Sequence, residues 1–376
     1  MTLSCQKSTP VIRDGVYDYK SLFEEAPTIH VLLIKNALRA EITIHGGYEI
    51  IDSVNTVLDQ GTALQKSRIS VNNRSIVIGN KSYEINRVRI VSLRDGDIKL
   101  NDIRYRGEIK ILRQPNNTFS VVKAVDMESY IAGVVGSEMP SSWEEDALRA
   151  QAIIARTYAI NRINVRRGDI YHIEMLDLAY RGMANETAKI TRIVQDTKGI
   201  VIAYNWNIFP AFFHSTCGGH TEDSKHVFGI DSMPPLRGVV CNYCNNTKYS
   251  SWSVDIRKAD IEKRLRESNI NTPDISTVNT VDPGRSDRGS SVEIVFANGK
   301  KEMSANQFRL LVGPNLLYST AFTSRSNGNN ITFSGKGFGH GVGLCQYGAQ
   351  GMAKNGFPYT SILKHYYPGI ELIRLY

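Results

Sequence analysis

Short runs of alternating apolar residues, separated by turn residues, occupy most of the chain between residues 28 and 125. In one of them, Ile42 and Ile44 alternate with polar neighbours, and Asn72 and Asn73 follow another. A period of two is typical of strands that bury one face. We therefore expect a β-rich region over 28–102, without site chemistry, after a polar, irregular tail over 1–27. The expected strands cover residues 30–34, 40–45, 67–71, 87–91, 102–113 and 118–125.

A helical pattern begins near residue 142. Ser142 and Glu145 have the spacing of a capping box, so we expect a helix from there to about Arg162. Strands and helices then mix as far as the C-terminus, and the polar segment 279–290 is expected to be an internal linker. The expected fold class is α+β: a β-rich N-terminal region, then a mixed α/β core with a central cleft over 103–376.

The net charge of the chain indicates which classes of binding partner to expect. The net charge of +8 favours nucleic acid, an anionic membrane or an acidic cell-wall polymer, or serves solubility alone. No basic run is interleaved with aromatic residues, so we expect no nucleic-acid partner. No segment has the roughly 20 apolar residues of a membrane span. Residues 1–20 lack the apolar stretch of a signal peptide, which leaves the compartment open.

Glu138 is the first candidate for catalysis. It lies in Ser137-Glu138-Met139-Pro140, where we expect a short turn before the helix. A lone glutamate among apolar neighbours can keep its proton near neutral pH and donate it. Arg149 and Arg156, seven residues apart, share one face of the next helix. Either both guanidinium groups face Glu138, or Arg149 only pairs with Glu145.

Three cysteines and a histidine have the spacing of a metal site. Cys217 and His220, then Cys241 and Cys244, form two pairs of ligands separated by a loop. Two such pairs can complete a closed, structural zinc site. A disulfide from Cys217 to Cys241 or Cys244, or free buried thiols, are the alternatives, and His214 and His226 are reserve ligands.

A glycine-rich block over 335–351 is the third candidate. It lacks the Gly-Lys-Ser/Thr ending of a phosphate loop. Glycine at alternate positions lets a ligand or another backbone segment come close. His340, Gln346 and Tyr347 are then placed to line a cleft, and the alternative is that His340 and Tyr347 are polar residues of the core.

These segments together resemble the stage II sporulation protein D / amidase-enhancer (SpoIID/LytB) family. The resemblance covers roughly residues 103–376, in the right order. It is carried by four segments: Ser137–Pro140, Ala147–Tyr158, His214–Thr221 and Gly339–Ala349. It implies a lytic transglycosylase of peptidoglycan. Glu138 would be the catalytic acid/base, with Arg149, Arg156 and Tyr347 matching further functional positions, and some members carry zinc near the His-Ser-Thr segment.

The resemblance also implies partners. The expected substrate is the peptidoglycan glycan strand, stripped of stem peptides, with Ser215 among the residues that bind it. A transglycosylase uses the sugar's own C6 hydroxyl as nucleophile, so a single carboxyl is sufficient. The main alternative is a glycan-binding enhancer of a cell-wall amidase without catalysis, and a zinc hydrolase is a third. Each activity requires a place in the cell envelope, outside the cytoplasm.

Overall fold

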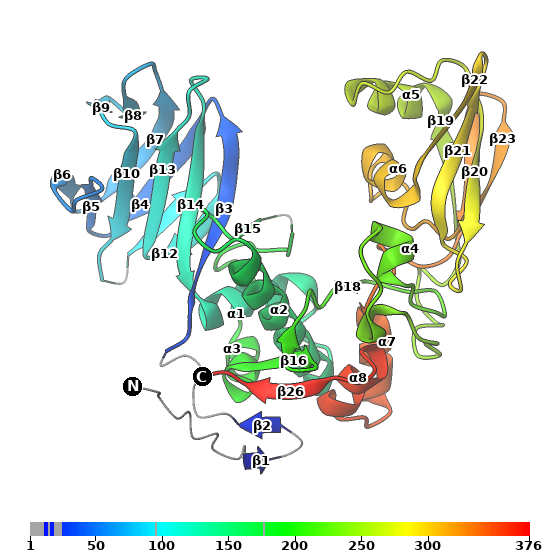
Figure 1. The fold of residues 1–376 in the computed structure, drawn as a ribbon. Helices are drawn as coiled ribbons and strands as arrows, with labels where there is room; N and C mark the ends of the chain where they lie inside the picture. The colour runs from blue at the N-terminus through cyan, green and yellow to red at the C-terminus, as the bar shows by residue number, and fades with distance from the viewer. Residues whose placement is uncertain (1–10, 14–15, 19–24, 95, 176) are drawn as a thin grey trace, which may run out of the picture.

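The computed structural model describes residues 11–13, 16–18, 25–94, 96–175 and 177–376 (Figure 1). Most of the expected tail, namely residues 1–10, 14–15 and 19–24, lies outside the described residues. Within it, β1 (Val11–Arg13) and β2 (Val16–Asp18) pair with each other, and β2 lies parallel to β26 (Glu371–Arg374). The expectation of an irregular tail is therefore wrong for these two strands, which extend a sheet that the C-terminal strand also joins.

Two sheets form the N-terminal region, and the strands expected there between residues 30 and 125 are all present. The first sheet is antiparallel except where β15 joins β3 in parallel. In order across it lie β15 (Ile173–Glu174), β3 (Thr28–Ala37), β14 (Phe119–Asp126), β13 (Glu108–Arg113), β10 (Arg87–Ser92), β5 (Tyr48–Ile51) and β6 (Val57–Gly61). The second sheet contains β12 (Ile103–Arg106), β11 (Asp97–Leu100), β4 (Ala40–His45), β7 (Leu64–Val71), β8 (Ile76–Ile78) and β9 (Lys81–Tyr83). Ile42 and Ile44 are buried, as the alternation predicts.

Strand β14 leads directly into helix α1 (Met127–Glu138), which the sequence did not predict. Asp126 caps this helix by accepting a hydrogen bond from the Ser129 N–H. Its residues from Met127 to Val135 are buried except Ser129. A helix that is buried on nearly all sides lacks the amphipathic stripe by which helices are recognised in a sequence.

Helix α2 (Glu145–Val165) begins later than expected. Its N-cap is Glu144, and no side chain caps it, so the predicted capping box at Ser142 is wrong. The helix packs against α1, against α3 (Ala188–Asp196) and against β16 (Ile200–Tyr204). The sheet beneath these helices has the order β1, β2, β26, β16 and β17 (Asn207–Ile208). Helices α7 (Gln346–Lys354) and α8 (Tyr359–Tyr366) also contact α2.

Residues 252–335 form an inserted unit with its own apolar core, which includes Phe308 and Phe333. One sheet contains β19 (Trp252–Arg257), β24 (Asn330–Gly335) and β23 (Phe322–Asn327), and the other β20 (Ile275–Pro283), β21 (Gly289–Phe296) and β22 (Gly299–Ser304). Helices α5 (Lys258–Glu267) and α6 (Ala305–Val312) cover them. The predicted linker at 279–290 is wrong, because these residues form the β20–β21 hairpin.

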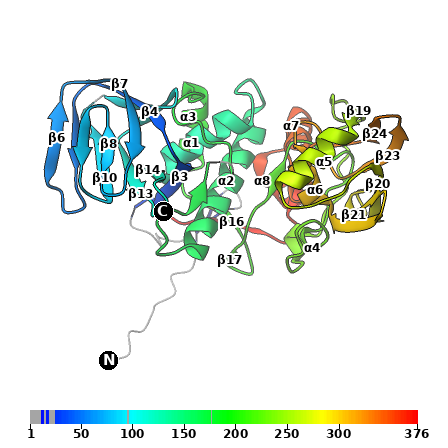
Figure 2. The same ribbon diagram turned by 90° about the horizontal axis from the view of Figure 1, so that it is seen from above.

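The N-terminal sheets and the inserted unit lie at opposite ends of the molecule, with α1 and α2 between them (Figure 1, Figure 2). One apolar core continues from the N-terminal sheets into the helices and the C-terminal strand. The expected boundary at 102/103 falls inside the β11–β12 hairpin. The fold class is α+β, as predicted. Among the described residues, no helix is long and apolar enough to span a membrane.

Candidate active site and metal centre

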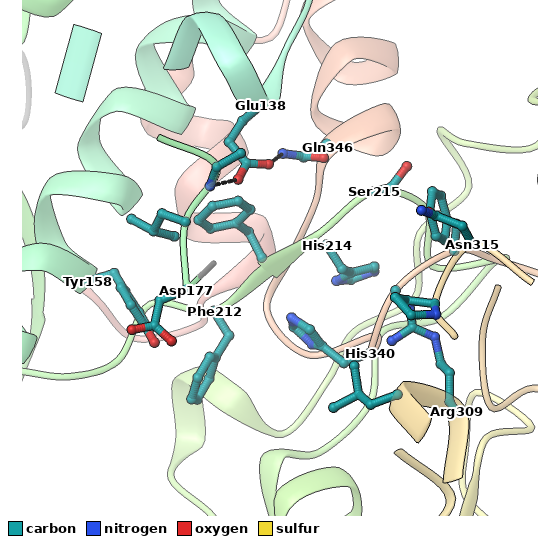
Figure 3. Close-up of a pocket in the computed structure, with 17 residues that line it drawn as sticks. Glu138, Tyr158, Asp177, Phe212, His214, Ser215, Arg309, Asn315, His340 and Gln346 are labelled. Carbon is teal, nitrogen blue, oxygen red and sulfur yellow. Dashed lines mark hydrogen bonds between the residues drawn. The ribbon is translucent and has the colours of Figure 1, made fainter. Parts of the chain in front are cut away.

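Glu138 is the last residue of α1, and it lines a pocket of about 630 Å³ (Figure 3). Pro140 follows two residues later, and a proline disfavours helical backbone at the residue before it. The carboxylate therefore lies at a helix end rather than on a free turn. Its Oε1 accepts the Ala179 N–H at 2.8 Å, and its Oε2 accepts the Gln346 side-chain amide at 3.2 Å.

Burial raises the pKa of the Glu138 carboxyl. The hydrogen bonds from Ala179 and Gln346 favour the ionised form and partly offset this effect. The C-terminal end of a helix also carries the negative end of its dipole, which disfavours an anion. Glu138 thus keeps its proton to a higher pH than an ordinary glutamate does, as a general acid requires.

Distant parts of the chain form the walls of this pocket. They are Tyr158 of α2, the 177–179 loop, the 212–215 segment around β18 (Phe213–His214), four residues of the inserted unit (Arg309, Leu310, Pro314, Asn315), and Phe338, Gly339, His340 and Gln346 of the glycine-rich block. Aromatic rings alternate with a few polar groups along these walls. Such a lining is typical of a binding site for a small, partly apolar ligand.

The glycine-rich block brings the two sides of the pocket together. Its strand β25 (Leu344–Cys345) pairs in parallel with β18. Gly343 has φ = 70°, and a Cβ there would lie 1.9 Å from the Phe212 carbonyl oxygen. A Cβ at Gly341 would lie 2.1 Å from Nε of Arg288. The glycines therefore allow the close approach of protein segments, which is one of the two roles that their spacing predicted.

Three of the predicted binding residues lie at this pocket with Glu138: Ser215, His340 and Gln346. His340 Nδ1 accepts the Val342 N–H at 3.1 Å, which leaves Nε2 as the donor. Burial, together with Arg309 and Arg288, lowers the pKa of His340 to about 3. His340 is thus a neutral hydrogen-bonding group at neutral pH and does not supply positive charge.

Arg156 does not face the pocket, contrary to one of the alternatives from the sequence. Its side chain is fully buried and donates to both carboxylate oxygens of Glu128, at 2.9 and 2.6 Å. A third bond goes to the Ile200 carbonyl at 2.9 Å. Arg156 therefore joins α1, α2 and β16 from within the core.

Arg149 and Tyr347 also lie outside the pocket lining. Arg149 donates to Glu145 at 2.7 Å, as the other alternative held, and lies 3.5 Å from Asp196. Tyr347 packs its ring edge-on against Trp143, with 5.0 Å between centroids. The Tyr347 N–H donates to the Ser215 carbonyl at 3.0 Å. The backbone of Tyr347 therefore contacts the 212–215 segment, although its side chain does not line the pocket.

The structure adds pocket residues that the sequence did not indicate, namely Tyr158, Asp177, Arg309 and Asn315. Asp177 is exposed, and Figure 3 shows its carboxylate beside the Tyr158 hydroxyl, away from Glu138. The pKa of Tyr158 is raised by burial and by Asp177. No motif surrounds these residues, and only the tertiary fold brings them to the pocket.

Four buried cysteines form the candidate metal centre: Cys217, Cys241, Cys244 and Cys345. Their sulfur atoms lie within 4.8 Å of one another, and all four are free thiols, so the alternative of a disulfide is wrong. In tetrahedral zinc thiolate sites, with Zn–S near 2.3 Å, the sulfurs lie about 3.8 Å apart. The Cys217 and Cys244 sulfurs are 3.4 Å apart, close to that spacing.

Cys345 replaces His220 in the predicted ligand set. His220 turns its Nδ1 to the Thr221 carbonyl at 2.5 Å and is not part of the cluster. Cys345 lies in the cluster because its strand, β25, pairs with β18, which ends shortly before Cys217. The prediction of His220 as a ligand is therefore wrong, and those of Cys217, Cys241 and Cys244 agree with the cluster.

The surroundings of the cluster fit zinc. Backbone N–H groups of Cys217 and Gly348 donate to the Cys345 sulfur, and that of Gly219 donates to the Cys217 sulfur. Such bonds stabilise thiolates. Arg288 is fully buried nearby and donates to the Cys217 carbonyl at 3.2 Å, and its Nε has no partner among the described residues. A zinc ion with four thiolates carries a net charge of −2, which this cation would offset.

Comparison with known proteins places the central part of the chain in one family. The model of the SpoIID stage II sporulation protein family matches residues 115–204, which include Glu138 and both central helices. An uncharacterised protein of Brachyspira hyodysenteriae is 31% identical over 73% of each chain. The chain belongs to the SpoIID family. The stage II sporulation protein D of Bacillus subtilis is 29% identical over 70% of this chain and 78% of its own length.

A further relative is named as an amidase enhancer rather than as a sporulation protein. The amidase enhancer of Bacillus subtilis is 27% identical over 64% of this chain, but the match spans only 40% of that protein. Residues 239–343 match a domain of unknown function (DUF8618). That match includes the inserted unit, which supplies Arg309, Leu310, Pro314 and Asn315 to the pocket.

Proposed function

We propose that this protein is a lytic transglycosylase that cleaves the bond between N-acetylmuramic acid (MurNAc) and N-acetylglucosamine (GlcNAc) in peptidoglycan. The proposal depends on one observation: the Glu138 carboxyl, whose pKa is raised by burial, lines a pocket with aromatic and polar walls. Membership in the SpoIID family agrees with a role in the cell wall, since relatives are named stage II sporulation protein D and amidase enhancer.

A single carboxyl can carry out both proton transfers. Protonated Glu138 gives its proton to the glycosidic oxygen, O4 of GlcNAc, as the bond from C1 of MurNAc to that oxygen breaks. O6 of the same MurNAc attacks C1, and the Glu138 carboxylate takes the O6 proton. One bond breaks, one forms, and Glu138 regains its proton, leaving a 1,6-anhydro end without consuming water.

Other residues would orient the sugar. The Gln346 side chain and the Ala179 N–H each hold one oxygen of Glu138 and so fix the carboxyl at the pocket wall. The Ser215 hydroxyl would offer a hydrogen bond to a hydroxyl or N-acetyl group, and the neutral ring of His340 lines the pocket beside it. Zinc bound by Cys217, Cys241, Cys244 and Cys345 would have a closed shell and would only stabilise the adjoining segments.

Hydrolysis is the competing reaction, because Asp177 lines the same pocket. An inverting glycosidase uses a second carboxylate to activate water. Asp177 accepts the Glu174 N–H at 2.9 Å and lies beside Tyr158 rather than facing Glu138 (Figure 3). This placement favours the reaction that needs one carboxyl.

A non-catalytic role is the second candidate, and the relative named amidase enhancer favours it. In that case the pocket would bind glycan and the protein would raise the activity of a cell-wall amidase. Both functions place the protein in the cell envelope, outside the cytoplasm, with glycan strands free of stem peptides as its ligand.

The Glu138→Gln variant tests the proposal, and Glu144→Gln is the matched control, since Glu144 is exposed and makes no side-chain cap. Peptide-free glycan strands are digested, and the products are identified by mass spectrometry. We expect anhydro-ended fragments from the wild type and from Glu144→Gln, and a loss of at least roughly a hundredfold in Glu138→Gln. Equal yields from all three proteins would exclude Glu138 from the chemistry. Amidase stimulation without any fragments would favour the enhancer.

A further inference from the structure

Arg309 is a buried cation in the pocket wall. It lies on α6 of the inserted unit, and only 6% of the residue is exposed. Its Nε–H donates to the Tyr318 carbonyl at 2.9 Å. Among the residues that the structure describes, no aspartate or glutamate forms an ion pair with it.

The surroundings of Arg309 increase this excess of positive charge. Burial and the neighbouring Arg288 lower its pKa to about 10, so the guanidinium stays protonated at neutral pH. His340, next to it in the pocket, is neutral and adds no charge of either sign. A buried charge without a counter-ion is costly, and an anionic ligand would relieve that cost.

Arg309 and Glu138 line opposite walls of the same pocket. Figure 3 shows Arg309 and Asn315 on the side of the pocket opposite Glu138, with His340 and His214 between. The pocket is thus polarised, with a proton donor at one wall and a cation at the other. A ligand that spans this pocket would present an anionic group to Arg309 while the bond to be cleaved lies at Glu138.

We propose that Arg309 is the carboxylate-binding residue of this pocket and that it recognises the lactyl carboxylate of a MurNAc residue without a stem peptide. This inference rests on the proposed function. The hydroxyl and N-acetyl groups of the glycan are neutral, so the lactyl group on O3 is its anionic group. On a strand with stem peptides this carboxyl is an amide, which is neutral and bulky. C3 and C1 belong to one ring, which agrees with Arg309 and Glu138 lining one pocket.

The inserted unit would then determine substrate selectivity. It contributes Arg309 and its neighbours Leu310, Pro314 and Asn315 to the pocket, whereas Glu138 and Gln346 come from the helices of the central region. The general acid and the selectivity for peptide-free strands would therefore reside in different parts of the chain.

The test measures binding in the Glu138→Gln background, in which turnover does not interfere. Three tetrasaccharides are compared by calorimetry: a peptide-free GlcNAc–MurNAc strand, the same strand with its lactyl groups as methylamides, and chitotetraose. We expect Glu138→Gln to bind the carboxylate form roughly ten- to a hundredfold more tightly than the methylamide. Adding Arg309→Gln should abolish this preference while leaving chitotetraose binding unchanged. Adding Arg309→Lys, which keeps the charge but not the planar fork, should retain part of it.

Arg266→Gln, on the exposed face of α5, is the control and should keep the full preference. Equal binding of the carboxylate and methylamide strands by Glu138→Gln would overturn the role of Arg309 while glycan binding stands. A preference that survives Arg309→Gln would overturn it as well. If Glu138→Gln binds none of the three saccharides, the proposed function itself fails, and the inference with it.

Discussion

At the scale of single residues, two opposing effects set the pKa of Glu138. Removal from water raises it, and the donors Ala179 and Gln346 lower it. The donor from Ala179 belongs to the backbone, whereas that from Gln346 can be removed by mutation. Gln346 therefore offers a way to change the acidity of Glu138 without touching its carboxyl.

Gln346→Met should move the alkaline limb of the pH–rate profile upward. A donor to the carboxylate stabilises the anion, so its loss raises the pKa of Glu138 further. Because the general acid must be protonated, activity falls as pH rises through this pKa. We expect the limb of kcat/KM to shift to higher pH. Gln195→Met, on the exposed face of α3, should leave the limb in place. A limb that moves downward or stays fixed in Gln346→Met contradicts the account.

At the scale of elements, buried polar groups join segments that the sequence separates. Arg156 and Glu128 connect α2 to α1, and Tyr376 at the C-terminus donates to Glu128 at 2.6 Å. The cysteine cluster likewise connects the segment after β18 to β25 and to the 241–244 loop. These groups hold together the elements that carry the pocket.

Arg156→Met should destabilise the protein strongly, since it leaves the Glu128 carboxylate buried without its partner. We expect the free energy of unfolding in urea to fall by about 3–5 kcal/mol. Arg149→Met, on the same helix, should cost less than about 1 kcal/mol because its ion pairs are at the surface. The double variant Arg156→Met/Glu128→Gln should recover part of the loss. A mild effect in Arg156→Met, accompanied by weaker glycan binding, would instead support the substrate-binding role that the resemblance implies.

Cys345→Ser should lower the zinc content of the purified protein well below one ion per chain, whereas His220→Ala should keep one. Removing a ligand opens the closed shell, and His220 lies outside the cluster. Elemental analysis gives the stoichiometry, and thermal unfolding with and without a chelator shows whether the metal stabilises the fold. Normal zinc in Cys345→Ser together with zinc loss in His220→Ala would restore the ligand set expected from spacing.

The sequence predicted features that depend on local pattern. Alternation identified the N-terminal strands, the Ser-Glu-Met-Pro segment indicated Glu138 as a candidate, and spacing indicated three of the four clustered cysteines. Cys345 was missed because only the parallel pairing of β25 with β18 brings it to the others. The two arginines share a helix face, but the residues that cover this face are decided by packing. Helix α1 was missed because burial on nearly all sides removes its amphipathic signal.

At the scale of the whole molecule, the pocket lies where the central region meets the inserted unit. The central region shares one core with the N-terminal sheets, and the inserted unit has a core of its own. Glu138 comes from the first and Arg309 from the second. The selective cleavage of peptide-free strands that we propose therefore needs both units in their observed arrangement.

Digestion of peptide-free glycan strands in water enriched in ¹⁸O tests the central claim most directly. Intramolecular attack by O6 takes no oxygen from water, whereas hydrolysis adds one oxygen at the new reducing end. We predict that wild-type protein releases fragments with anhydro ends and no ¹⁸O, and that Glu138→Gln releases none. Fragments that carry ¹⁸O at a reducing end would contradict the account and would indicate a hydrolase, with Asp177 as the candidate base.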